Sequence, residues 1–172
     1  MCIRDRALVP EIARALEEMA AGKPPVLWIQ GQNCSGCSVS FLNTNFPDAA
    51  EVVLDKLSVR YQPTVMAAAG YQAFGVLEET AKELAGKYVL VVEGPIPTAE
   101  GGEYCTFGLE EASKDLMGNK VPKDKPIQVW MEELVPGAAA VIALGNCAAF
   151  GGLPAPNAPV PAATPVLSTP PT

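Results

Sequence analysis

The sequence predicts an α/β fold in which a parallel sheet is covered by helices on both faces. Strand-like and helix-like segments alternate along the chain, and the strand-like segments are largely apolar. We expect parallel strands near residues 26–31, 51–60, 88–93 and 139–145. Continuous apolar strands are typical of parallel sheets that are buried on both faces. The 172 residues, 49% of them hydrophobic, are enough for one domain with a hydrophobic core.

The first strand, Val26–Gln30, leads into a turn that carries Cys34 and Cys37. Gly31 ends the strand, and Ser38–Asn43 can begin a helix. The two thiols therefore lie between the carboxyl end of a strand and a helix N-terminus, where α/β sheets bind ligands and where thiolates are favoured. By itself, a Cys-x-x-Cys pair fits a redox dithiol, half of a zinc or iron–sulfur site, or two core thiols.

The next segments predict a second strand and a long helix. Glu51–Tyr61 alternates between apolar and polar residues, which favours a strand. Thr64 is a plausible N-cap for a helix over Val65–Leu84, and Gly86 would end that helix.

The third strand, Tyr88–Val92, is fully apolar and ends at Glu93, before a Gly-Pro turn. A carboxylate at a strand end is a candidate site residue, and the alternative is an acidic side chain solvated at a loop mouth.

Thr98–Pro126 reads as a long connection that carries Cys105, a thiol expected to pack as a small hydrophobic residue. Ile127–Val135 then predicts a short amphipathic helix.

The fourth strand, Ala138–Leu144, ends just before Cys147, and Ala148–Gly152 predicts a turn of small residues. Because the strand ends of one parallel sheet lie on one edge, Cys147 can meet Cys34 and Cys37 despite their separation in sequence. Three converging thiols favour a metal site over a redox dithiol, which needs only two.

The composition excludes several functional classes. The chain has no histidine, which removes Ser-His and Cys-His catalysis and His-ligated zinc. Its net charge is −7 and no basic patch stands out, so nucleic acid is not expected as a partner. Five cysteines are too few for a disulfide scaffold of this length, and no apolar run reaches transmembrane length. The turn after the first strand also lacks the Ser/Thr-rich phosphate loop that is typical of a flavin-binding module.

The two ends of the chain depart from the α/β pattern of residues 25–152. Residues 1–24 read as a non-native start followed by the remnant of an export signal, with a short helix over Ala7–Ala21. Residues 153–172 are rich in proline and carry no strand or helix signal, and we interpret them as a truncated continuation of the domain.

Four blocks of the sequence resemble the small subunit of nickel–iron hydrogenases. These blocks are VLWIQGQNCSGCSVSFLN, PTVMAAAG, VVEGPIPT and VIALGNCAAFGG, and their order and spacing match over roughly Pro25 to Val166. The resemblance implies a flavodoxin-like domain that holds a proximal [4Fe–4S] cluster and faces the nickel–iron site of a separate large subunit. The family shares its N-terminal fold with the 20 kDa iron–sulfur subunit of respiratory complex I, which is the second candidate.

The resemblance implies Cys34, Cys37 and Cys147 as three cluster ligands, with Glu93 as a nearby charge that tunes the cluster. The fourth ligand, in a Gly-Cys-Pro-Pro motif, and further clusters are expected beyond Thr172. The implied function is electron transfer between hydrogen chemistry in the large subunit and a carrier such as a cytochrome c. The implied location is periplasmic or membrane-associated, after export by a twin-arginine signal that these residues lack. A stand-alone dithiol oxidoreductase is the remaining alternative.

Three positions bear on which branch of the family the chain resembles. Asn33 stands where the family often has Glu, directly before the first ligand. Gly36 and Gly152 stand where oxygen-tolerant members carry extra cysteines, which suggests a standard four-cysteine cluster. The GEYC segment and the SVSFLN run are closest to the branch that pairs with selenium-containing large subunits.

Overall fold

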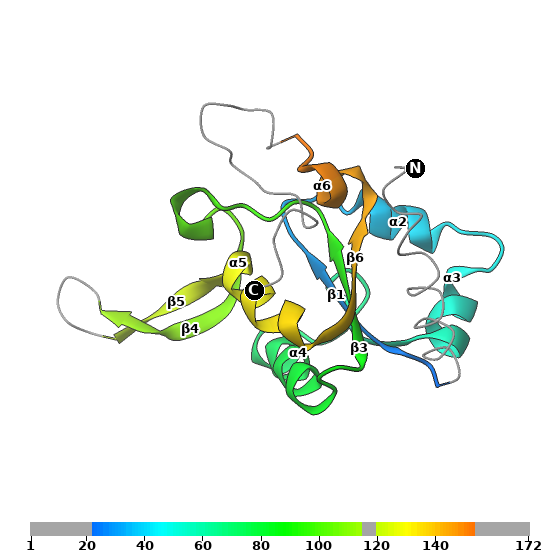
Figure 1. Cartoon of the computed structure of the whole chain (residues 1–172), viewed down its shortest axis with the longest axis horizontal. Helices are drawn as coiled ribbons and strands as arrows, with labels where there is room; N and C mark the ends of the chain where they lie inside the picture. The colour runs from blue at the N-terminus through cyan, green and yellow to red at the C-terminus, as the bar shows by residue number, and fades with distance from the viewer. Residues whose placement is uncertain (1–21, 115–119, 154–172) are drawn as a thin grey trace.

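The computed structural model describes residues 22–114 and 120–153 and confirms the α/β class. Within these residues, four parallel strands form one sheet in the order β2-β1-β3-β6 (Figure 1). The strands are β1 Pro25–Gln30, β2 Ser58–Tyr61, β3 Tyr88–Glu93 and β6 Ala138–Leu144. Gln30, Glu93 and Leu144 are neighbours across β1, β3 and β6, so these strands end together at one edge of the sheet.

Helices cover both faces of this sheet, as the sequence predicts. The helices are α2 Gly36–Leu42, α3 Ala49–Glu51, α4 Tyr71–Glu83, α5 Ile127–Leu134 and α6 Gly145–Phe150. Alternate side chains of a strand point to opposite faces. Accordingly, Leu27 and Leu90 pack in one core cluster with Leu77 of α4. Trp28 and its neighbours on the other face pack against Phe41 of α2.

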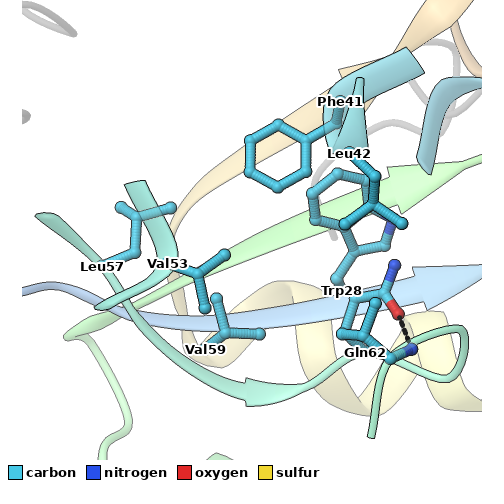
Figure 2. A pocket seen from close by; sticks show the side chains of 8 residues that line it. Trp28, Phe41, Leu42, Val53, Leu57, Val59 and Gln62 are labelled. Atoms are coloured by element: carbon cyan, nitrogen blue, oxygen red, sulfur yellow. Dashed lines mark hydrogen bonds between the residues drawn. The ribbon is translucent and has the colours of Figure 1, made fainter. Parts of the chain in front are cut away.

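An apolar pocket lies on the face of the sheet that α2 covers (Figure 2). Phe41 and Leu42 of α2 form one side, and Val53 and Leu57 form the opposite side. Its lining residues are Trp28, Phe41, Leu42, Val53, Leu57, Val59, Gln62 and Val65. This face is therefore covered by α2 and by the helical turn before β2.

The expected strand over residues 51–60 is wrong in its first half. Residues Val52–Lys56 form a π-helical turn, η2, directly after α3, and only Ser58–Tyr61 is extended. The Asp48 side chain accepts a hydrogen bond from the Glu51 N–H at 2.6 Å and so caps the start of α3. Capping by an aspartate favours a helical start over the strand that the alternation predicts.

The long helix expected from Val65 begins six residues later, at Tyr71. Gly70 is its N-cap, at φ 57°. Thr64 does not cap the helix, because its N–H donates to Gln62 Oε1 at 2.6 Å and its hydroxyl accepts from Gln30.

The connection expected over Thr98–Pro126 contains a short 3-10 turn, η3 Ala99–Gly102, and an antiparallel hairpin. The hairpin strands are β4 Thr106–Lys114 and β5 Lys120–Pro126, and they extend away from the main sheet (Figure 1). A second 3-10 turn, η4 Val135–Gly137, joins α5 to β6.

The predicted helix over Ala7–Ala21 and nearly all of the proline-rich continuation lie outside the described residues. Within the part that the structure describes, no helix is both long enough and apolar enough to span a membrane.

Candidate functional site

The candidate site residues gather at the carboxyl ends of β1, β3 and β6. Cys34 lies in the loop after β1, Cys37 in the first turn of α2, and Glu93 is the last residue of β3. The Cys37 Sγ atom lies 3.8 Å from the carbonyl oxygen of Leu144, the last residue of β6. The end of β6 therefore contacts the Cys-x-x-Cys turn, although Cys37 and Leu144 are 107 positions apart in the sequence.

Cys147 lies on a short helix rather than before a plain turn. The sequence predicts a small-residue turn over Ala148–Gly152, but α6 runs through Gly145–Phe150. Gly145 has φ +81°, which lets the chain turn sharply from β6 into the helix. Ala148 is fully buried in the main core and anchors α6 to the sheet.

Each of the three thiol sulfurs lies against a glycine. A Cβ atom added at Gly36 would lie 3.0 Å from Cys34 Sγ, and one added at Gly152 would lie 2.9 Å from Cys147 Sγ. At Gly145 the added atom would lie only 2.4 Å from Cys37 Sγ. Side chains are thus absent where they would crowd the sulfurs, which fits a bulky sulfur-ligated group held at this edge.

Glu93 is not solvated at a loop mouth, because its side chain is only 1% exposed. Its Oε1 accepts hydrogen bonds from the N–H groups of Cys37 and Ser38, at 3.1 and 3.2 Å. Its Oε2 accepts from the Ser38 hydroxyl at 2.5 Å, Trp28 Nε1 at 3.1 Å and Gln30 Nε2 at 3.3 Å. Burial alone would raise the pKa of Glu93, but these hydrogen bonds outweigh it and lower the pKa, so the carboxylate is ionised.

The environment of Cys37 disfavours its charged form. Burial raises the pKa of Cys37, and the nearby charges of Glu93, Cys34 and Cys147 raise it further. These groups oppose a free thiolate at this position. A bound metal reverses that preference, because coordination deprotonates a thiol.

Four residues of the site were missed from the sequence: Trp28, Gln30, Ser38 and Gln62. The strand period carried part of the signal, since Trp28 and Gln30 alternate onto the face that Glu93 shares. No sequence signal indicated Ser38 and Gln62, because the hydrogen bond between them depends on how α2 packs over the sheet.

Cys105 lies apart from this constellation. Its half-buried side chain packs against the core cluster of the opposite sheet face, and burial raises its pKa. Its backbone is tied to Gly102 and Ile127 by hydrogen bonds of 3.3 and 2.9 Å. The structure therefore places Cys105 as the small core residue that the sequence predicts.

Two buried polar atoms beside Cys34 have no partner among the described residues. They are Gln32 Oε1 and Asn33 Nδ2. Of the residues that the structure describes, no group of three or more His, Cys, Asp or Glu side chains is arranged to hold a single metal ion. The assignment of Cys34, Cys37 and Cys147 as cluster ligands stays a prediction.

Comparison with known proteins places this site in a family. Residues 34–171 match the family model described as NADH ubiquinone oxidoreductase, 20 Kd subunit. The chain belongs to this family. The chain is also similar to hydrogenase small subunits, which confirms the resemblance identified from the sequence.

Two relatives illustrate that similarity. The periplasmic [NiFeSe] hydrogenase small subunit of Desulfomicrobium baculatum is 41% identical over 85% of this chain and 44% of its own length. The uptake hydrogenase small subunit of Azotobacter vinelandii is 39% identical over 84% of this chain and 36% of its own length. The chain thus spans less than half the length of these relatives.

Solved structures agree with the assignment of the fold. The reduced, active Ni-Fe-Se hydrogenase from Desulfomicrobium baculatum matches with a TM-score of 0.74 and 39% identity, over 84% of this chain and 50% of that one. The recombinant [NiFeSe] hydrogenase from Desulfovibrio vulgaris Hildenborough matches with a TM-score of 0.73 and 38% identity, over 87% of this chain and 49% of that one.

Proposed function

We propose that this chain is the electron-transfer part of a nickel–iron hydrogenase small subunit. The observation that carries the proposal is the contact between the Cys37 sulfur and the end of β6, three residues before Cys147, in a chain similar to hydrogenase small subunits. A family with this sulfur chemistry implies an iron–sulfur cofactor, and we propose a proximal [4Fe–4S] cluster. Such a cluster supplies one-electron transfer when it is bound.

The residues of the chain would hold and shield that cofactor. Cys34, Cys37 and Cys147 would provide thiolates, and a fourth thiolate is expected beyond Thr172. Glu93 holds the backbone of the Cys-x-x-Cys turn and adds a fixed negative charge next to it. Cys34 is exposed and Cys37 and Cys147 are partly exposed in this chain, so shielding of the site from water would require a covering partner.

Partner, location and domain limits are part of the same proposal. The D. baculatum relative is named as a periplasmic [NiFeSe] hydrogenase subunit. By analogy, we propose a nickel–iron or nickel–iron–selenium large subunit as the partner, a carrier such as a cytochrome c as the redox partner, and a periplasmic or membrane-associated location. Residues 25–152 would form the iron–sulfur domain, with residues 1–24 a leader remnant and residues 153–172 its continuation.

Iron and acid-labile sulfide analysis after anaerobic reconstitution tests the proposal. A chain extended through the expected Gly-Cys-Pro-Pro motif should hold a stable cluster, and Cys147→Ser should remove it. The 172-residue chain should hold a labile cluster at most, because it would lack one thiolate. Absence of iron from the extended chain, together with a Cys34–Cys37 disulfide, would instead favour the dithiol oxidoreductase.

A further inference from the structure

Helix α2 has no cap of its own at the end that carries Cys37. Its N-cap residue, Ser35, lies in the left-handed region at φ 58° and makes no side-chain hydrogen bond to the helix. The first turn of α2, all of which the structure describes, also contains no acidic residue. The first N–H groups of a helix need acceptors, so these must come from elsewhere in the fold.

Glu93 of β3 supplies those acceptors. Its Oε1 accepts from the backbone N–H groups of Cys37 at 3.1 Å and of Ser38 at 3.2 Å. A carboxylate at this end of a helix also matches the partial positive charge of the free N–H groups. The backbone of Cys37 is thereby tied to a central strand of the sheet.

Ser38 links this carboxylate to two further segments. Its fully buried hydroxyl donates to Glu93 Oε2 at 2.5 Å and accepts from the side-chain amides of Gln30 and Gln62, each at 3.1 Å. Gln62 lines the pocket under α2 together with Trp28, which also donates to Glu93 (Figure 2). A hydroxyl can donate one hydrogen bond and accept two, and here it does both.

We propose that Ser38 is a positioning residue for Cys37 and acts through Glu93. The inference rests on the proposed role of Cys37 as a cluster ligand. Without the hydroxyl, Glu93 would lose one of its five donors, and the side-chain amides of Gln30 and the buried Gln62 would lose a shared acceptor. The first turn of α2 would then be held less firmly, together with the Cys37 sulfur that lies against Gly145.

Ser38→Ala in the 172-residue chain tests the proposal, with Ser40→Ala as the matched control. Ser40 lies on the same helix but is exposed. The measurements, made without iron, are amide hydrogen exchange and the alkylation rate of each cysteine with iodoacetamide. We expect Ser38→Ala to speed exchange at Cys37 roughly tenfold, the equivalent of one lost hydrogen bond. It should also change the Cys37 alkylation rate relative to that of Cys34, whereas Ser40→Ala should change neither.

Exchange at Cys37 equal to that of the control would overturn the proposal. A uniform rise in exchange across β1 and β3 would overturn it too, because that would reveal a general loss of stability. If Ser38→Ala does not fold, Gln62→Ala is the second variant. It removes one donor to the hydroxyl, and also the acceptor of the Thr64 and Val65 N–H groups, and it should give the same local pattern at Cys37 with a smaller amplitude. No local change in that variant would again count against Ser38. Failure of the extended chain to bind iron would contradict the proposed function and leave these measurements unaffected.

Discussion

Gly145 sets how closely the turn after β6 can approach the Cys37 sulfur. Its φ of +81° favours glycine, and a Cβ atom there would lie 2.4 Å from Cys37 Sγ. Because that separation is far below van der Waals contact, the sulfur or the turn would have to move. The contact therefore couples the thiol of α2 to the segment that carries Cys147.

Gly145→Ala should displace the Cys37 sulfur, and Gly86→Ala should not. Gly86 has nearly the same φ, +79° against +81°, but nothing lies within 4 Å of its Cβ position. Both substitutions should lower the free energy of unfolding by about 1–2 kcal/mol through backbone strain. Only Gly145→Ala should also alter the alkylation rate of Cys37. Urea unfolding and mass spectrometry of the alkylated chain measure the two effects, and equal alkylation in both variants would contradict the coupling.

Cys105→Ser should leave bound iron unchanged in the chain extended through the fourth ligand. Cys105 packs in the core on the opposite face of the sheet, so a hydroxyl there should lower the free energy of unfolding by about 1–2 kcal/mol. Cys147→Ser is the comparison, because it should remove iron. Loss of iron from the Cys105 variant would show that the ligand set is misassigned.

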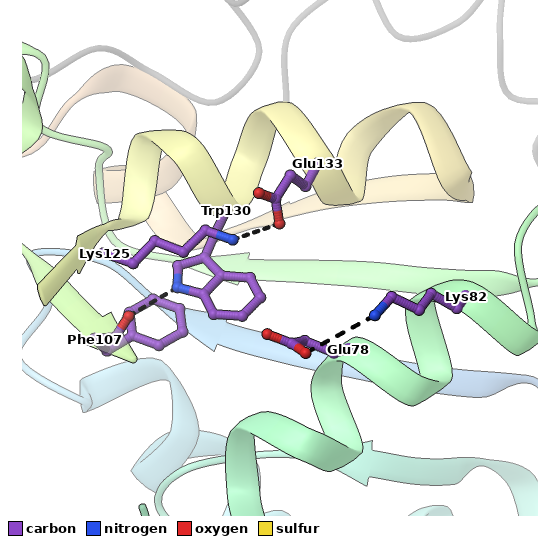
Figure 3. A network of polar contacts seen from close by, with 6 residues as sticks. All are labelled: Glu78, Lys82, Phe107, Lys125, Trp130 and Glu133. Carbon is purple, nitrogen blue, oxygen red and sulfur yellow. Dashed lines mark hydrogen bonds and ion pairs between the residues drawn. The ribbon is translucent and has the colours of Figure 1, made fainter. Parts of the chain in front are cut away.

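Among the elements, the β4–β5 hairpin is attached to α5 through a buried cation and an aromatic stack. Lys125, at the end of β5, is 8% exposed and its Nζ lies 3.8 Å from the centre of the Trp130 ring. The same Nζ forms an ion pair with Glu133 at 2.5 Å (Figure 3). Trp130 also stacks on Phe107 of β4, with ring centroids 5.4 Å apart. Both hairpin strands are thereby joined to one helix.

Lys125→Met should lower the free energy of unfolding by about 1–2 kcal/mol, because a desolvated cation–π contact and its ion pair are both lost. Lys82→Met is the matched control, since Lys82 pairs with Glu78 at 4.0 Å on the exposed surface of α4 (Figure 3). That change should stay within about 0.5 kcal/mol. Chemical denaturation followed by tryptophan fluorescence compares the two, and equal effects would refute the anchoring role of Lys125.

The sequence predicts the buried elements better than the exposed ones. The strands β1 and β3 and the helix α5 follow from apolar runs and helical periodicity, which burial in the core enforces. The edge strand β6 also follows from an apolar run, although its residues are only partly buried or exposed. The turn before β2 was misassigned because the cap made by Asp48 outweighs the alternation that follows it. The hairpin was missed because its strands carry few apolar residues to give a period.

The candidate site divides in a similar way. The placement of Cys34, Cys37, Glu93 and Cys147 near strand ends could be predicted, because Glu93 ends a strand and the three cysteines follow strands of the same parallel sheet. Their role as ligands stays a prediction. The hydrogen bonds of Ser38 could not, because they depend on contacts between side chains that no spacing in the sequence encodes.

For the molecule as a whole, the two helices that carry Cys37 and Cys147 each expose a large apolar side chain. Val39 of α2 and Phe150 of α6 are exposed on the two helices that carry Cys37 and Cys147. Exposed apolar groups around a site are typical of a surface that a partner protein covers. This placement supports the proposed docking of a large subunit at this edge.

The isolated chain should self-associate through this edge as its concentration rises. Changing Val39 and Phe150 together to serine should shift the association to higher concentration, because the apolar contact area is reduced. Leu54→Ser is the control, since Leu54 is at least as exposed as Val39 and Phe150 but lies on η2, before the opposite end of β2. Sedimentation velocity measures the shift, and an equal effect of the control would show that the edge has no special role.

The five donors that surround the Glu93 carboxylate bear on how fast an electron could enter or leave this edge. An electron moves quickly only if the surrounding dipoles need little rearrangement when the charge changes. A carboxylate that is held from both oxygens, with its donors on β1 and α2, has little freedom to reorient. The reorganisation energy contributed by this part of the protein would be small, so a hydrogen-bond arrangement that fixes a cysteine would also lower the barrier to electron transfer.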